Sequence, residues 1–310
     1  MQSRLNEVNH AAALWYESSN YILPLLAESL KLLSVISLSS IRGSVPAGQP
    51  MLAFSENFPG GIQLPEFTRF IQEWLNIMTK RKPELIVALD LDSGGAAGEL
   101  TARLGSEVGW VKVGKQLFTR EGPGLIRDLR EEYGKKVFLD LKFHDIPNTA
   151  AQATRSAAAI GADMVNVHAS GGLPMLRAAA EAAKESGVVL VAVTVLTSLN
   201  ADDLRRTGIE ADPAEQVLRL ARLSVEAGVA GAVCSPQEIT LLRSAINDDF
   251  LLVTPGIRPA SASGDDQKRI MSPAQAARAG ADYIVVGRPV TAAVDPRAAA
   301  AAVLAELHPG

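Results

Sequence analysis

The densest group of reactive side chains in this sequence is the set Asp140, Lys142 and Asp145. They lie within residues 138–149, whose sequence is FLDLKFHDIPNT. Residues two apart on a β-strand share a face, so Asp140 and Lys142 should lie side by side. Neighbouring carboxylates favour the ammonium form of a lysine, which can protonate or stabilise a carbanion but does not suit Schiff-base chemistry. The motif predicts an acid–base site; an ordinary ion-pair network is the structural alternative.

A second candidate site is a phosphate-binding region near the C-terminus. Gly287 and Arg288 directly follow one apolar run, and the segment TPGIR, residues 254–258, follows another. Glycine lets a backbone N–H approach a phosphate closely, and arginine offers a planar fork of donors. Gln267 lies in the polar loop 257–272, which has the length and composition of a lid. The pattern favours a phosphorylated substrate, with plain turns as the alternative.

Both groups fall within a regular alternation of strands and helices. The predicted strands are Glu84–Leu91, Val108–Gly114, Lys136–Lys142, Asp163–His168, Val188–Val195, Ala230–Cys234, Phe250–Thr254 and Asp282–Val286. The predicted helices are Ala97–Ser106, Gly124–Tyr133, Asn148–Ile160, Leu173–Ser186, Ala214–Ala227, Pro236–Ile246, Pro273–Ala279 and Pro296–Leu307. Such units in series predict an α/β fold, a parallel (β/α)₈ TIM barrel. An open doubly wound sheet would need a glycine-rich fingerprint after the first strand, which is missing.

The alternation of side chains predicts where the polar groups meet. In each of the first four strands, aliphatic residues alternate with residues that turn polar toward the C-terminal end, where barrel enzymes carry their active sites. The predicted inward set is Asp90, Lys112, Asp140, Lys142, Asn166 and His168. For any single residue of this set, a solvated strand end is an equally good explanation. Because all six residues share the same parity, we expect them to converge at one opening of the barrel. His168 alone is better explained as a hydrogen-bonded wall residue.

Composition excludes several classes of function. The chain has 310 residues, 47% of them hydrophobic and 5% aromatic, which suits helices packed on strands. A net charge of −4 argues against binding to nucleic acid or to an anionic membrane surface. Cys234 is the single cysteine, which fits a reducing compartment. The apolar segment Tyr21–Ile41 contains charged residues, so neither a membrane span nor a signal peptide is expected, and the protein is predicted to be cytoplasmic.

Residues 1–77 differ from the rest of the chain. They show no strand–helix alternation, and Ser, Asn, Gly and Pro divide them into short pieces. They could be a real appendage, partly helical around Leu23–Leu33 and Phe67–Ile77, or an extension outside the functional enzyme. The second interpretation is favoured because the barrel is complete without them. The catalytic domain is therefore predicted to span residues 78–310, after an irregular N-terminal extension.

With these motifs, the chain resembles the orotidine 5′-phosphate decarboxylase family. The shared segments are VALD (87–90), VKVG (111–114), DLKFHDIPNT (140–149), LTS (196–198), TPGIR (254–258), DQKR (266–269) and VGRP (286–289). They occur in this order across residues 83–310. The D-x-K-x-x-D core also occurs in related sugar-phosphate barrels, but its extension through Ile-Pro-Asn-Thr is highly specific. Residues 1–77 have no counterpart in the family pattern.

The resemblance implies decarboxylation of orotidine 5′-phosphate to uridine 5′-phosphate (UMP) in de novo pyrimidine synthesis, without metal or organic cofactor. Lys142 would protonate C6 of the pyrimidine as the carboxylate leaves. Asp140 would lie against that carboxylate, and Lys112 would complete the charge network.

The same resemblance implies the binding residues. Asp90 and Lys112 would bind the ribose, and Thr197 or Ser198 the edge of the pyrimidine. The phosphate would be held by Arg288, Gly287, Gln267 and Arg258. Asp145 and Thr149 would reach into a partner's site, so a homodimer with two shared sites is expected.

Two other functions compete with this one. The first is a metal-dependent sugar-phosphate decarboxylase, aldolase or epimerase on the same barrel, with Asp90, Asp140 and His168 as ligands. Its activity should be lost on metal removal. The second is a phosphate-binding protein without catalysis, against which the intact set of Asp140, Lys142 and Asp145 argues.

Overall fold

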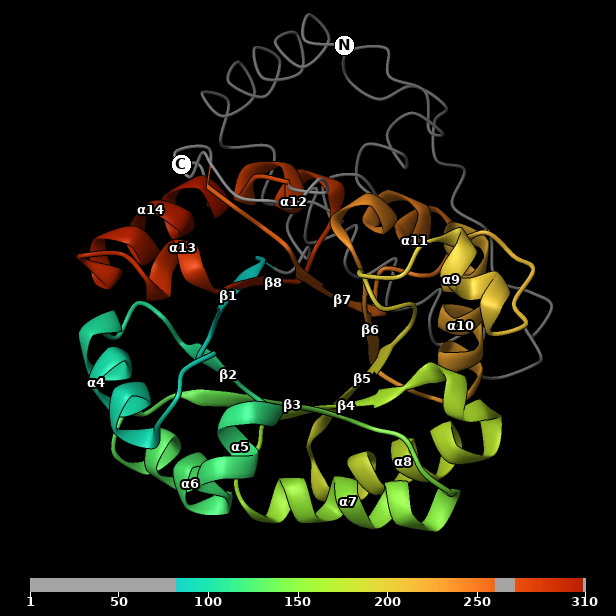
Figure 1. Ribbon diagram of the computed structural model, residues 1–310, viewed down its shortest axis with the longest axis horizontal. Helices are drawn as coiled ribbons and strands as arrows, with labels where there is room; N and C mark the ends of the chain where they lie inside the picture. Colours follow the sequence, from blue (N-terminus) through green and yellow to red (C-terminus); the bar gives the residue numbers. More distant parts are fainter. Residues whose placement is uncertain (1–81, 260–270, 309–310) are drawn as a thin grey trace, which may run out of the picture. The chain divides into compact units, whose positions relative to one another are not determined.

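Eight parallel strands form a closed barrel in sequence order (Figure 1). The computed structural model describes residues 82–259 and 271–308, so the predictions for residues 1–77 and for Gln267 lie outside the described residues. The strands are β1 (Glu84–Ala88), β2 (Trp110–Gly114), β3 (Lys136–Phe143), β4 (Met164–His168), β5 (Val189–Val193), β6 (Gly231–Val233), β7 (Leu251–Pro255) and β8 (Tyr283–Val286). Pairing of β8 with β1 closes the barrel. The predicted (β/α)₈ fold is confirmed.

Helices surround the barrel on its outside (Figure 1). They are α4 (Gly94–Leu104), α5 (Lys115–Glu121), α6 (Pro123–Glu131), α7 (Pro147–Ala159), α8 (Gly172–Ser186), α9 (Ala201–Arg206), α10 (Pro213–Glu226), α11 (Ile239–Ala245), α12 (Pro273–Ala279), α13 (Arg288–Thr291) and α14 (Pro296–Leu307). Short 3₁₀ turns, η1 (Ala169–Gly171) and η2 (Pro236–Glu238), precede α8 and α11. Proline in the first turn begins α7, α10, α12 and α14, as its fixed φ favours. The short helices α5, α9 and α13 were not predicted.

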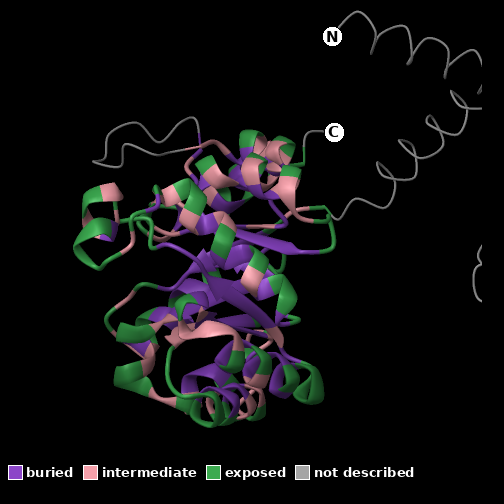
Figure 2. Ribbon diagram, turned by 90° about the vertical axis from the view of Figure 1, so that its right-hand side faces the viewer, coloured by how far each residue is buried: buried purple, intermediate pink, exposed green. Residues whose placement is uncertain are grey.

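Two apolar layers lie on the two faces of the sheet. The barrel interior is filled by Ile86, Ala88, Trp110, Phe138, Met164, Val191, Val253 and Val285. The alternate residues of the same strands, such as Val87, Val111 and Val137, pack outward against the helices. Figure 2 shows the buried strands at the centre and the exposed residues on the outer elements. The predicted alternation of inward and outward side chains is therefore confirmed for the N-terminal parts of the first four strands.

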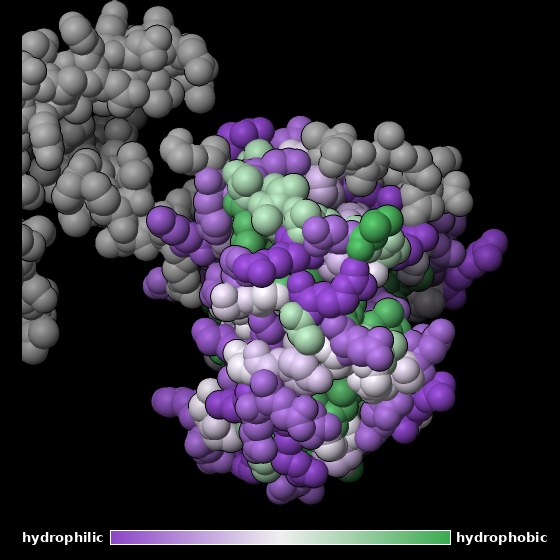
Figure 3. Space-filling view, turned by 90° about the vertical axis from the view of Figure 1, so that its left-hand side faces the viewer, coloured by the Kyte–Doolittle hydropathy of each residue, from purple (hydrophilic) through white to green (hydrophobic). Residues whose placement is uncertain are grey.

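The surface of the outer layer is mainly polar. Hydrophilic side chains cover most of the face shown in Figure 3, and hydrophobic areas on it are smaller. Among residues 82–259 and 271–308, no helix has the length and apolar character needed to cross a membrane.

The predicted strands differ from the structure by a few residues at one end or both, and two of these differences bear on the site. β1 ends at Ala88 rather than Leu91, so Asp90 stands in the loop beyond the strand. In β3 the pairing with β4 moves from Leu139↔Val165 to Phe143↔Val167, which leaves additional residues on β3. Lys142, within this bulge, has a φ of 54°. The regular alternation of side chains between the two faces of β3 thus ends before Lys142, because a bulge changes the local direction of the backbone.

Strand β6 approaches β7 unusually closely at Gly231. A Cβ atom placed on Gly231 would lie 2.4 Å from the carbonyl oxygen of Leu251. Only glycine fits this position without moving one strand, so Gly231 sets the spacing of β6 and β7.

Candidate active site

A pocket of about 420 Å³ opens at the C-terminal ends of the strands. Most of the predicted site residues line it: Asp90, Lys112, Asp140, Lys142, Thr197, Arg258, Gly287 and Arg288. They come from β2, from β3 and from the segments after β1, β5, β7 and β8. The remaining wall is largely apolar and includes Val193, Val195, Leu196, Val233 and Ile257. Convergent polar groups in a pocket with apolar wall residues are typical of a small-molecule site, and this pocket is unusually rich in charge.

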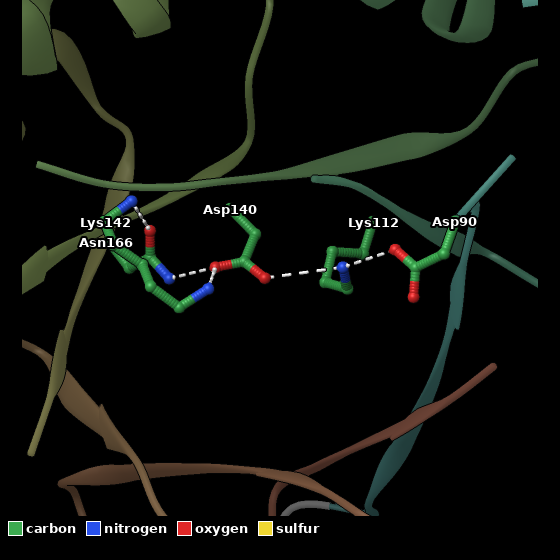
Figure 4. Close-up of polar contacts among 5 residues, drawn as sticks. All are labelled: Asp90, Lys112, Asp140, Lys142 and Asn166. Atoms are coloured by element: carbon green, nitrogen blue, oxygen red, sulfur yellow. Dashed lines mark hydrogen bonds and ion pairs between the residues drawn. The ribbon is translucent and has the colours of Figure 1, made fainter. Parts of the chain in front are cut away.

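Four charged side chains of alternating sign cross the pocket floor (Figure 4). Lys112 Nζ lies 3.1 Å from Asp90 Oδ1 and 3.4 Å from Asp140 Oδ2. Lys142 Nζ lies 2.5 Å from Asp140 Oδ1. We call Asp90, Lys112, Asp140 and Lys142 the charged row. Asp90 is 66% exposed, whereas the side chain of Asp140 is only 13% exposed.

Strand register explains why the charged row is continuous. Ala88 is paired with Lys112, and Gly114 is paired with Asp140, so successive strands carry their polar residues to the same edge. Gly114 also leaves space above this edge. A Cβ there would lie 3.3 Å from Lys112 Nζ and 3.5 Å from Asp90 Oδ1.

Asp140 is held as a carboxylate by its surroundings. Burial is the largest single influence and would raise its pKa. The ammonium groups of Lys112 and Lys142, with hydrogen bonds from Lys142 and Asn166, outweigh burial and hold the pKa of Asp140 below its usual range. The pocket floor therefore carries a desolvated negative charge between two positive ones.

Lys142 adopts a backbone conformation that few residues other than glycine adopt. Its positive φ lies in the left-handed region, where strain costs about 1–3 kcal/mol. Its backbone N–H donates to Asn166 Oδ1 at 2.7 Å, and Asn166 Nδ2 donates to Asp140 Oδ1 at 2.7 Å. The sequence analysis placed Asn166 among the inward-facing polar residues but predicted no role for it. The only indication in the sequence was that Asn166 shares the strand parity of the other polar residues.

Arginine and glycine residues form the side of the pocket after β7 and β8. Gly256, Arg258, Gly287 and Arg288 all line the pocket. Gly287 lies near Asp90 at one end of the charged row, because a Cβ on Gly287 would be 3.9 Å from Asp90 Oδ2. The backbone N–H of Arg258 donates to the Met271 carbonyl at 3.0 Å. Gln267 lies outside the described residues. This side has the donors that a phosphate needs.

Three predicted site residues do not line the pocket. Ser198 is absent from its wall, and so are Asp145 and Thr149, which are exposed. Asp145 Oδ1 accepts the N–H of Ile146 at 2.7 Å, and within this single chain it makes no ion pair with Lys142. The expected carboxylate on both sides of Lys142 is therefore present only on the side of Asp140. The resemblance implies that Asp145 and Thr149 act in a partner's site, and that role stays a prediction.

His168 lies outside the pocket wall, half buried, with its ring centroid 5.4 Å from that of His144. Burial lowers the pKa of His168, and His144, Lys115 and Lys142 lower it further, against a smaller opposing effect of Asp140. The lowered pKa favours a neutral imidazole, and the expected role of His168 as a hydrogen-bonded wall residue stays a prediction. Among the residues that the structure describes, no three His, Cys, Asp or Glu side chains form a group able to hold a metal ion.

Comparison with known proteins gives a consistent result. The model of the "Orotidine 5'-phosphate decarboxylase / HUMPS family" matches residues 83–303. Orotidine 5′-phosphate decarboxylase of Moorella thermoacetica is 49% identical over 247 residues, which are 77% of this chain and 97% of the relative. The protein of the same name from Chromohalobacter salexigens is 53% identical over 225 residues, 72% of this chain and 95% of the relative.

The solved structures agree with the sequence relatives. The crystal structure of orotidine 5′-phosphate decarboxylase from Lactobacillus acidophilus has a TM-score of 0.66 and 41% identity. The match covers 73% of this chain and 99% of that chain. The alignment thus includes nearly all of the relative, whereas about a quarter of this chain lies outside the alignment.

Proposed function

Because the chain belongs to the orotidine 5′-phosphate decarboxylase / HUMPS family, we propose that it is a carboxy-lyase that converts orotidine 5′-phosphate to UMP and CO₂. This reaction would serve pyrimidine biosynthesis. The observation that carries the proposal is the charged row on the floor of a pocket that Arg258 and Arg288 also line. The row would meet the reacting end of the substrate, and the arginines its phosphate.

Lys142 is the proposed proton donor. In this scheme the bond between C6 and the carboxylate breaks, its electron pair stays on C6, and CO₂ leaves. The Lys142 ammonium, 2.5 Å from Asp140, gives a proton to C6 and later regains one from water. A fixed ammonium stabilises the carbanion as it forms, because it needs no reorganisation in a site partly removed from solvent.

Asp140 and Lys112 are the proposed partners of Lys142. Asp140 would lie against the substrate carboxylate and hold Lys142 in place, since both share one hydrogen bond. Lys112, between Asp90 and Asp140, would balance the negative charge of the row. Asp90 and Lys112 would bind the ribose hydroxyls, and Thr197 or Ser198 the pyrimidine edge.

Gly287, Arg288, Arg258 and Gln267 form the proposed phosphate end. Phosphate is remote from the reacting carbon, so its binding energy can be used to position the substrate. The Gly287 N–H and the two guanidinium groups supply donors from adjacent strand ends.

The proposed enzyme works as a homodimer, in the cytoplasm, without a metal or an organic cofactor. Support for the dimer comes from Asp145 and Thr149, which are exposed beside Ile146, an apolar residue that is itself 67% exposed. A second protomer that covers this region would bury Ile146 and could bring Asp145 to its own Lys142.

The test is an assay of the purified protein with orotidine 5′-phosphate after exhaustive treatment with a chelator. We expect loss of substrate absorbance with stoichiometric formation of UMP, at the same rate before and after metal removal. Loss of activity with the metal and its return on adding a divalent cation would instead support the metal-dependent alternative. A preparation that never consumes the substrate would refute the proposal.

A further inference from the structure

Asn166 joins both members of the Asp140–Lys142 pair through one side chain. It lies on β4, is 1% exposed and does not line the pocket. Its Oδ1 accepts the backbone N–H of Lys142, and its Nδ2 donates to Asp140 Oδ1, both at 2.7 Å (Figure 4). A backbone N–H can only donate and a carboxylate can only accept, so the amide has one possible orientation.

The bulge in β3 explains why this amide is needed. The pairing of β3 with β4 is interrupted between Leu139 and Phe143, opposite Asn166. In a regular ladder a carbonyl of the neighbouring strand would accept the N–H of a residue such as Lys142. At the bulge the Asn166 side chain supplies that acceptor, and it thereby holds Lys142 at its positive φ.

The second bond of Asn166 fixes the carboxylate. Asp140 Oδ1 receives two donors, Lys142 Nζ at 2.5 Å and Asn166 Nδ2 at 2.7 Å. Its other oxygen, Oδ2, is then the one that faces Lys112, at 3.4 Å. A partial rotation of the carboxylate plane would weaken these bonds, so the amide helps to fix the plane in which the two oxygens meet Lys142 and Lys112.

We propose that Asn166 is a positioning residue for decarboxylation: it sets the backbone of Lys142 and the orientation of Asp140 without contacting the substrate. This inference rests on the proposed function. It predicts that loss of Asn166 lowers turnover much more than it lowers affinity for the nucleotide, because the phosphate end of the pocket is left unchanged.

Two substitutions separate the two bonds. Asn166→Asp keeps an oxygen that can accept the Lys142 N–H but places a second carboxylate against Asp140. Asn166→Leu has a similar volume and removes both bonds. Ser224→Ala on α10 is the matched control, because it also removes a fully buried hydrogen bond, to the Leu220 carbonyl, away from the pocket.

The expected signature is a split between kcat and KM with a displaced pH profile. In Asn166→Asp we expect kcat to fall at least about tenfold and the acid limb of kcat to move to higher pH, since adjacent carboxylates share a proton. The other charged and titratable groups around Asp140, namely Asp90, Lys112, Lys142 and His168, are unchanged by the substitution. KM should change less than about threefold, and Ser224→Ala should keep the wild-type kcat.

A folded Asn166→Asp enzyme with wild-type kcat and pH profile would overturn the inference. A crystal structure of Asn166→Leu gives a second readout that does not depend on turnover. We expect Lys142 to leave the left-handed region or to lose its contact with Asp140; an unchanged pair would also overturn the inference. If wild-type protein showed no decarboxylation, the proposed function would fail, while the crystal structure would still decide whether Asn166 positions the pair.

Discussion

At the scale of single residues, the site depends on charges that compensate one another at short range. Asp140 is largely buried, and it remains ionised because Lys112 and Lys142 lie on either side of it. Removing either lysine leaves a carboxylate in a poorly solvated place, which is costly. Effects on chemistry must therefore be separated from effects on folding in each variant.

Lys142→Ala should abolish decarboxylation. The ammonium is the proposed source of the proton and of the carbanion's stabilisation, so kcat should fall by at least about a thousandfold. Far-ultraviolet circular dichroism and UMP affinity should change little. Lys184→Ala, on the exposed end of α8, is the matched control and should have wild-type activity. Turnover near the wild-type rate in folded Lys142→Ala would contradict the assigned role.

Arg288→Ala should weaken binding of UMP about ten- to hundredfold, because a charged hydrogen bond to phosphate contributes about 1.5–3 kcal/mol. Uridine, which has no phosphate, should bind both proteins with similar affinity. Isothermal titration with the two ligands measures this difference. Equal losses for uridine and UMP would show that Arg288 acts elsewhere than at the phosphate.

At the scale of elements, the sequence predicted the barrel well because each strand has a simple repeating environment. One face of each strand packs in the barrel and the other against helices, so alternation of side chains was sufficient to place Lys112 and Asp140. The helices α5, α9 and α13 were missed because seven, six and four residues show too little periodicity. The bulge at Lys142 was missed because it depends on the pairing of β3 with β4, and the Asn166 amide that accepts the Lys142 N–H belongs to that other strand.

Gly231→Ala should destabilise the barrel by about 1–3 kcal/mol, because the added methyl group would overlap the backbone of β7. Chemical denaturation measures the change. Gly109→Ala is the control: Gly109 is exposed, and a Cβ there would meet no atom within 4 Å. The Gly109→Ala substitution should leave the free energy of unfolding unchanged. Equal stability of the two variants would mean that β6 and β7 can separate without cost.

At the scale of the whole molecule, the positions of Asp145 and Thr149 could be predicted but their partners could not, because those partners would belong to a second chain. The family match begins at residue 83, so we propose that residues 78–310 form the catalytic domain. A chain that begins at Met78 is expected to keep full activity.

Mixing two inactive variants tests the shared site. Lys142→Ala and Asp145→Ala homodimers should both be inactive. After subunit exchange, each mixed dimer would have one complete site, so random mixing should restore about a quarter of wild-type activity. Sedimentation should give the mass of a dimer. A monomer, or no recovery after confirmed exchange, would contradict the shared site.

The ring of strands has a consequence for synthesis on the ribosome. β1 is paired with β8, and Glu84 meets Tyr283, which lies 283 − 84 = 199 residues later in the chain. Until β8 has left the exit tunnel, the nascent sheet has two unpaired borders, and open strand borders promote aggregation. Nascent chains that stop before Tyr283 should therefore need chaperones, and release of the last strand is the step that ends that need.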